Sequence, residues 1–189
     1  MKLLDRMPPL DPVAMTDAQR RAADELTAGP RGGVKGPFIP LLRSPELMDR
    51  LQKVGEYLRY HSFLDMRISE FAMLLVSRHW TQQFEWATHV PLALKVGLRE
   101  EHIDALAEGR RPAGMTPDEE IAYDLVDEVL TSHGVCDATY ERAIASLGES
   151  GVIDLLGVVG YFTTVAMVLN VAHTPAESTA VRPLAPFPR

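Results

Sequence analysis

The sequence predicts an all-α protein, and three observations support this fold class. Apolar residues recur at helical spacing in most segments, Pro and Gly residues separate these segments, and no alternating run bounded by hairpin turns occurs. The chain has 189 residues, of which 46% are hydrophobic and 24% are charged, an ordinary globular composition that can bury one substantial core. We therefore expect a single domain over residues 1–189 with about seven or eight helices.

The first helices are predicted from their caps. Three prolines in residues 1–15 predict an extended arm, and Thr16 is a typical N-cap for the helix that follows. Residues 31–45 are rich in Gly and Pro and predict a loop, whose apolar side chains cover the core or a pocket mouth. Pro45 then begins a helix that runs to about Tyr60. Its predicted buried face consists of Leu47, Leu51, Val54 and Leu58.

Two helices with a break between them are predicted in the centre of the chain. Asp65 opens a helix to about His79, and Thr81 caps a second helix that begins at Gln82 and ends at Gly97. The break would place Gln82 at a helix N-terminus, where free N–H groups and the positive end of the helix dipole favour a developing anion. A further short helix follows, and we expect its histidine to be solvated.

The rest of the chain predicts two capped helical segments and a long apolar one. Thr116 to Glu119 combine an N-cap, a first-turn proline and a capping-box glutamate, and Asp137 caps a helix that ends at Gly148. Residues 151–172 are almost wholly apolar, and the uncharged residues from Leu155 to Ala172 reach the length of a membrane span. Polar side chains inside this segment and the lack of flanking basic residues favour the centre of a bundle. The Pro-rich tail predicts an arm on the body or on a neighbouring subunit.

Charge and cysteine content narrow the function classes. The formal net charge is -7 and no long basic cluster occurs, so we expect no nucleic-acid partner. Cys136 is the single cysteine, which rules out an intrachain disulfide. The N-terminal residues carry charges and prolines where a signal peptide needs an apolar run, so we expect a cytoplasmic protein without a membrane partner.

The candidate site lies in residues 68–97. Arg78, Gln82, Glu85 and His89 follow one another at steps of four, three and four, which would place all four on one helix face among apolar residues. Such a stripe is typical of a pocket lining and makes a candidate acid–base site together with Glu70. The alternative is a charged helix face on which Glu85 and His89 simply pair.

The same residues resemble the carboxymuconolactone decarboxylase-like family. The resemblance rests on Glu70, on R78-H79-W80, F84-E85-W86 and H89, and on segments such as GPF at Gly36 and DLLGVVGYFTTVAMVLN at Asp154. It covers a core of about residues 36–173. It implies an all-α bundle of the alkylhydroperoxidase D type, assembled as a homo-oligomer: a trimer or hexamer, or sometimes a dimer.

The resemblance also bears on the reaction class. In the peroxidase branch of that superfamily a Glu precedes a C-x-x-C-x-x-x-H segment, and here Glu70 and His89 match while Gln82 and Glu85 occupy the two Cys positions. Neither can form a disulfide, so thiol peroxidase activity is not expected. The expected enzyme is a carbon–carbon lyase, or a related isomerase or hydrolase, acting on a small carboxylated lactone or keto acid, as in aromatic degradation.

In the namesake reaction a carboxylated lactone loses carbon dioxide, and the enzyme stabilises an oxyanion and protonates carbon. The expected catalytic residues are Glu70, Glu85 and His89, with His89 as the proton donor. Arg78 suggests a substrate carboxylate and would act with the helix start at Gln82. We expect the walls of the pocket to be formed by Phe38, Trp86 and Tyr161.

Two other hypotheses stay open. Glu70, Glu85 and His89 could form a metal site, but no H-E-x-x-H motif or Cys cluster accompanies them, so we expect no metal and no cofactor. A non-catalytic ligand-binding or assembly subunit of the same fold would carry the same stripe with its charges mutually neutralised. His61 and His173 could reach a pocket or cap helix ends.

Overall fold

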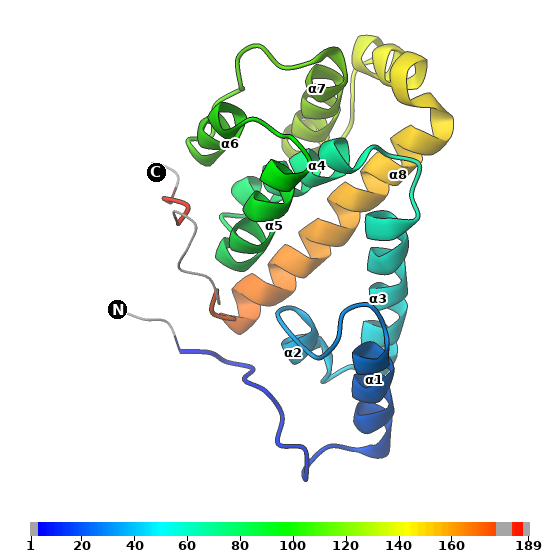
Figure 1. Cartoon of the computed structure of the whole chain (residues 1–189), viewed down its shortest axis with the longest axis vertical. Coiled ribbons are helices and arrows are strands. Elements are labelled where there is room, and N and C mark those ends of the chain that lie inside the picture. The colour runs from blue at the N-terminus through cyan, green and yellow to red at the C-terminus, as the bar shows by residue number, and fades with distance from the viewer. Residues whose placement is uncertain (1–3, 177–182, 187–189) are drawn as a thin grey trace.

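The computed structural model describes residues 4–176 and 183–186, and this part of the chain contains eight helices and no strand (Figure 1). The predicted all-α class and the number of helices are confirmed. The helices are α1 Asp17–Ala28, α2 Phe38–Leu41, α3 Pro45–Tyr60, α4 Met66–His79, α5 Gln83–Lys95, α6 Glu100–Ala107, α7 Pro117–Ser132 and α8 Asp137–Ala172.

The long helix α8 runs through the middle of the bundle (Figure 1). Helices α4 and α7 pack along it on one side, α2 and α3 on the other, while α5 packs against α4 and α1 against α3. By length and composition α8 passes for a membrane span, but much of its apolar stretch is buried inside the bundle. A core helix of a globular fold meets the same criterion, because it is apolar all round.

Several predicted helix starts are confirmed by their hydrogen bonds. Thr16 forms a capping box with Gln19, Asp65 accepts from the N–H of Arg67, and Thr116 forms a capping box with Glu119. These side chains satisfy N–H groups that the first helical turn leaves without partners. Residues 4–16 form the predicted extended arm, whose Arg6 N–H donates to the carbonyl of Ala172.

Two local predictions were wrong. The loop over residues 31–45 contains the short helix α2. On α3 the buried face is Met48, Gly55 and Leu58, whereas Leu47 and Val54 are both 48% exposed. The apolar stripe of α3 is therefore wider than the face that this single chain covers.

The caps of α5 and α8 also differ from the prediction. Gln82, and not Thr81, caps α5, and Thr81 has a φ of 47° in the turn before it. Cys136 is the N-cap of α8, so Asp137 is its first residue. Gly148 breaks α8 with φ 69° and ψ 172°, which agrees with the predicted helix end there, and the chain resumes as a helix directly.

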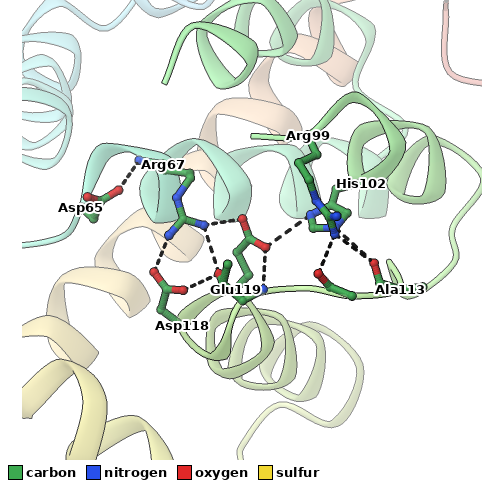
Figure 2. A network of polar contacts seen from close by, with 9 residues as sticks. Asp65, Arg67, Arg99, His102, Ala113, Asp118 and Glu119 are labelled. Carbon is green, nitrogen blue, oxygen red and sulfur yellow. Dashed lines mark hydrogen bonds and ion pairs between the residues drawn. The ribbon is translucent and has the colours of Figure 1, made fainter. Parts of the chain in front are cut away.

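His102 is buried and not solvated, and Figure 2 shows its polar contacts. Its ring lies between Arg99 and Glu119, with Nδ1 3.3 Å from a Glu119 oxygen and Nε2 facing Arg99 and the Ala113 carbonyl. The other Glu119 oxygen accepts from Arg67. This network ties the start of α4 to α6 and to the start of α7. A surface position was predicted because the preceding glutamates are exposed, but the opposite face of this short helix packs inward.

Candidate active site

The corner between α4 and α5 brings the acidic and histidine side chains together. Helix α4 ends at His79 with Trp80 as its C-cap, and Thr81 turns the chain with its positive φ. The side chain of Gln82 then accepts from the N–H groups of Phe84 and Glu85. The side-chain amide of Gln82 also donates to Asn170 of α8, whose own amide donates to the Trp80 carbonyl. The two helices therefore form a hairpin fixed to α8, and residues of both face one site.

Glu70, His89 and Glu85 form a buried row, which we call the acid–base triad. His89 Nδ1 lies 2.7 Å from Oε2 of Glu70, and His89 Nε2 lies 3.5 Å from Oε2 of Glu85. All three residues are 5% exposed or less. The first distance is a normal hydrogen bond, whereas the second is longer than one, so Nε2 is the less tightly held end of the ring.

The two carboxylates keep the imidazole of His89 protonated. Burial alone lowers the pKa of His89, but the hydrogen bond with Glu70 and the nearby charges of Glu70 and Glu85 outweigh it and raise the pKa to about 9. An opposite charge within a few ångströms favours the ionised form of a group. His89 thus carries a proton at neutral pH and can act as an acid.

A pocket with a volume of about 360 Å³ opens onto Glu85 and His89. Phe162 forms part of its wall and meets the His89 ring edge to face, with centroids 5.1 Å apart. Gly36, with φ 53°, lets the preceding loop pass directly against the ring of Phe84. The lining consists of Pro30, Arg31, Gly33, Lys35, Pro37, Phe38, Arg59, Tyr60, Phe84, Glu85, Thr88, His89, Tyr161, Phe162 and Val165.

Three basic side chains line this pocket. Arg31 and Lys35 come from the loop before α2, and Arg59 comes from the last turn of α3. The guanidinium of Arg31 lies 4.5 Å from the centre of the Phe38 ring, and its buried Nε atom has no hydrogen-bond partner among the described residues. Such a buried donor is costly to leave unsatisfied, and an anion in the pocket would satisfy it.

Tyr161 and Arg31 meet above Gly55 of α3. A β-carbon at Gly55 would overlap the Tyr161 hydroxyl and stand 2.8 Å from Nη2 of Arg31. Burial raises the pKa of the Tyr161 phenol, with Arg31 opposing and Glu85 adding to the rise. The phenol therefore stays protonated at neutral pH and is available as a hydrogen-bond donor beside the triad.

The structure brings together part of the predicted site. Glu70, Glu85 and His89 form the triad, and Phe38 and Tyr161 line the pocket as expected. The prediction that Arg78 shares a helix face with His89 was wrong, because the chain breaks between them at the α4–α5 corner. Arg78 and Trp86 instead line a separate cavity on the other side of α5.

Gln82 is likewise absent from the pocket lining. Its side chain occupies the N–H groups of Phe84 and Glu85 that would have received a substrate anion. It therefore holds the end of α5 in place, and the expected anion site at the helix start is filled by the protein itself.

Sequence reasoning missed Arg31, Arg59 and Lys35 as pocket residues. The only available signal was the Gly- and Pro-rich loop over residues 31–45, whose apolar residues predicted that it covers the core or a pocket mouth. Arg59 gave no signal, because one arginine near a helix end is ordinary and its position depends on how α3 crosses α8.

The triad does not have the arrangement of a metal site. No group of three or more His, Cys, Asp or Glu side chains in residues 4–176 and 183–186 is placed to hold a metal ion. The ring of His89 stands between the two carboxylates, so the three side chains do not converge on one point.

Cys136 is exposed at the start of α8 and contacts Glu128 and Thr139.

Comparison with known proteins identifies the fold. No protein-family model and no curated protein sequence matches the chain. Among solved structures it is similar to an uncharacterized peroxidase-related protein with an alkylhydroperoxidase AhpD core from Ralstonia eutropha JMP134, with a TM-score of 0.69, 15% identity and 88% of each chain covered. The chain therefore has the alkylhydroperoxidase D-like fold.

Proposed function

We propose that this protein is a carboxymuconolactone decarboxylase-like enzyme that uses acid–base chemistry on a small carboxylated lactone or keto acid. The observation that supports it best is the buried Glu70–His89–Glu85 triad, of which Glu85 and His89 line a pocket that also carries three basic side chains. A protonated imidazole beside a pocket lined by three basic side chains suits a reaction in which an anion loses carbon dioxide and carbon takes up a proton.

Substrate binding in this proposal relies on the basic side chains. The substrate carboxylate and carbonyl lie toward Arg31, with Lys35 and Arg59 adding positive charge at the mouth of the pocket. Arg31 takes the role that the sequence suggested for Arg78. Because its Nε lacks a partner among the described residues, Arg31 can bind a carboxylate without first losing a hydrogen bond at that atom.

The reaction then needs an oxyanion stabiliser and a proton. As the bond to the carboxyl group breaks, carbon dioxide leaves and its electron pair moves through the double bond onto the carbonyl oxygen. Tyr161 and Arg31 donate to that oxygen. The electron pair then returns from the oxygen to the ring or chain carbon, which takes the proton of His89 Nε2 directly or through Glu85. His89 regains a proton from water. Glu70 holds the other ring nitrogen at 2.7 Å and orients the ring.

Two-cysteine peroxidase chemistry does not suit these residues. The one cysteine of the chain, Cys136, lies at the start of α8 and does not line the pocket of the triad. Gln82 and Glu85, at the positions that the family resemblance assigns to thiols, have no redox chemistry.

The test is carbon dioxide release from γ-carboxymuconolactone and from a panel of β-keto and vinylogous acids. We expect His89→Ala to lower turnover by about 10²–10⁴-fold, and Glu70→Gln to lower it while leaving substrate binding in place. The exposed His61 provides the matched control, because His61→Ala removes an imidazole away from the pocket. Full turnover in a folded His89→Ala protein would refute the assignment.

A second candidate is a non-catalytic ligand-binding protein of the same fold. It is favoured by the fact that both ring nitrogens of His89 face carboxylates and that His89 is only 2% exposed. Calorimetric titration separates the two, since this candidate predicts binding of a small carboxylate that depends on Arg31 and no turnover of any panel member.

We further propose a cytoplasmic homo-oligomer, a trimer or hexamer or else a dimer. Apolar side chains left exposed on one chain support it, among them Leu47, Val54, Phe63 and Ile153, of which Phe63 is 83% exposed. A second copy would cover such residues. Light scattering on the purified protein gives the number of subunits, and a monomer at micromolar concentration would contradict this part.

A further inference from the structure

One side of the long helix α8 is left uncovered by the described residues. Its exposed and half-buried members recur at steps of three or four, which places them in one row along the helix. This row, which we call the α8 stripe, consists of Ile153, Leu156, Gly160, Thr164, Met167 and Val171. It contains no charged residue and extends over about 27 Å. Its four large apolar side chains are between 38% and 66% exposed, which is typical of a surface that contacts another protein.

The α8 stripe has nearly the same pattern in both directions. Counted from residue 162, its members lie nine, six and two positions before it and two, five and nine positions after it. Branched residues, Ile153 and Val171, stand at the two ends, Leu156 and Met167 come next, and small residues lie in the middle. A β-carbon at Gly160 would meet no atom within 4 Å, so the centre is open to a close neighbour. A row that matches its own reverse can pair with itself about a two-fold axis.

A cavity of about 530 Å³ adjoins one end of the α8 stripe. Ile153 and Leu156 line it together with apolar side chains of α7. At the other end of the stripe Met167 and Val171 are 41% and 58% exposed. The hollow end of one stripe meets the Met167 end of another only when the two helices run in opposite directions.

Exposed apolar side chains extend this surface at both ends. Phe63, whose N–H donates to Asp154 beside Ile153, is 83% exposed. At the other end the carbonyl of Leu4 lies 3.2 Å from Nδ1 of His173, and Leu4 is also 83% exposed. Between antiparallel helices the Phe63 end of one copy meets the Leu4 end of the other. The buried area thus grows beyond one helix face, toward the roughly 800 Å² per partner of a stable interface.

We propose that a second copy of this chain covers the α8 stripe, with its own α8 antiparallel and a two-fold axis near residue 162. The pairing rests on the homo-oligomer of the proposed function and specifies its contact. Ile153 then faces the partner's Val171, and Leu156 faces the partner's Met167, which enters the cavity between α7 and α8. A closed two-fold pair fits a dimer or a hexamer, but not a trimer alone.

Charge favours a second copy over a different protein. Asp154 is the one charged residue between positions 153 and 172, and it accepts from the Tyr57 hydroxyl and the Phe63 N–H of its own chain. Pairing the two stripes therefore buries no unpaired charge. An uncharged row offers no ionic group by which an unrelated partner would be selected.

Disulfide trapping tests the pairing in the full chain. In a Cys136→Ser background, which leaves no other thiol, Ile153→Cys is combined with Val171→Cys and exposed to a mild oxidant. The two positions lie about 27 Å apart in one chain, too far for an intramolecular disulfide. We expect fast formation of a covalent dimer. Each single-cysteine variant is the matched control and should stay largely uncross-linked, because neither position faces itself across the axis.

The other outcomes overturn the pairing. Fast cross-linking of a single variant would mean that the two helices run parallel, and covalent chains longer than a dimer would mean an open, head-to-tail contact. An oligomer by light scattering in which the double variant does not cross-link would refute this contact and leave the homo-oligomer standing, whereas a monomer would refute both. Ile153 and Val171 do not line the pocket of the triad, so the result is independent of the carbon dioxide assay.

A charge exchange tests the contact of Leu156 with the partner's Met167. Leu156→Glu and Met167→Lys should each give monomers, because each places a charge against an apolar side chain. An equimolar mixture of the two should form dimers again, since one contact then joins opposite charges and the other keeps the original residues. Analytical ultracentrifugation measures the association.

Val171→Lys provides the matched control for the mixture. Mixed with Leu156→Glu it should stay monomeric, because the two substitutions do not face each other. Equal association of both mixtures would refute the register. A Leu156→Glu protein that keeps its oligomeric state would show that the α8 stripe lies outside the interface.

Discussion

The hydroxyl of Tyr161 lies directly above the α-carbon of Gly55, in the space that any larger residue at position 55 would fill. The prediction is that Gly55→Ala pushes Tyr161 and Arg31 out of place. Alanine in a helix interior ordinarily stabilises a protein by about 0.5–1 kcal/mol relative to glycine. A loss of stability in Gly55→Ala therefore has to come from the clash with Tyr161 and Arg31. In the carbon dioxide assay we expect a fall in kcat/KM of at least about ten-fold, since one donor to an oxyanion is worth that or more.

Gly160 provides the matched control for this substitution. It is helical, and a β-carbon there would meet no atom within 4 Å. Gly160→Ala should therefore raise the free energy of unfolding by about 0.5–1 kcal/mol and leave kcat/KM unchanged. Equal activity of the two variants would contradict the role given to Tyr161 and Arg31.

Stability should depend on pH through His89. Its pKa rises from 6.5 in the unfolded chain to about 9 in the folded protein. The folded state binds the proton more tightly, so this stabilisation is fully present below pH 6.5 and is lost as pH rises through 9. The loss is on the order of 3 kcal/mol.

Urea denaturation at a series of pH values measures this dependence. His89→Gln should flatten the curve between pH 6.5 and 9, whereas His61→Gln, at an exposed position, should leave it unchanged. An unchanged slope in His89→Gln would show that the proton of His89 is not held by the two carboxylates.

Thr81 is a β-branched residue with a φ of 47°, a conformation that L residues other than Asn and Asp rarely adopt. Thr81→Gly should relieve this strain and raise the free energy of unfolding by about 1 kcal/mol. Thr131→Gly, in the exposed last turn of α7, should lower it by a similar amount. Thermal denaturation shows whether each variant is more or less stable than the original protein. If Thr81→Gly is less stable, the Thr81 side chain stabilises the fold by more than its backbone strain destabilises it.

Glu119 serves both the capping box of α7 and the buried contacts with Arg67 and His102 (Figure 2). Glu119→Ala should lower the free energy of unfolding by roughly 2 kcal/mol or more, because a cap is lost and Arg67 keeps only part of its charge compensation. Its exposed neighbour provides the control, and Glu120→Ala should change stability by less than about 0.5 kcal/mol. Equal urea midpoints would contradict the structural role of the network.

The sequence predicted the elements of this fold better than the arrangement of its site. Caps such as Thr16, Asp65 and Thr116 depend on local hydrogen bonds, so their residue types suffice to place helix starts. The contact of Glu70 with His89 followed from a family resemblance. Arg78 was placed with them by helical spacing, which fails once Thr81 turns the chain.

Residues whose position depends on tertiary packing could not be predicted. Arg31 reaches the pocket only because α2 and its loop fold over α3 and α8, and Gly55 leaves room for it. His102 looked solvated because the adjacent glutamates are polar, and only the packing of α6 against α4 and α7 buries it. Such contacts join segments far apart in the chain, where periodicity carries no information.

The acid–base triad lies on the α4–α5 hairpin, whereas the basic pocket residues lie on the loop before α2 and at the end of α3. In the proposed mechanism, proton transfer and substrate choice thus belong to separate pieces of the chain. A library randomised at positions 31, 35 and 59 should change which acids are accepted while the titration of His89 stays close to its original value. This fold therefore offers a starting point for directed evolution in which new specificity can be selected without rebuilding the chemistry.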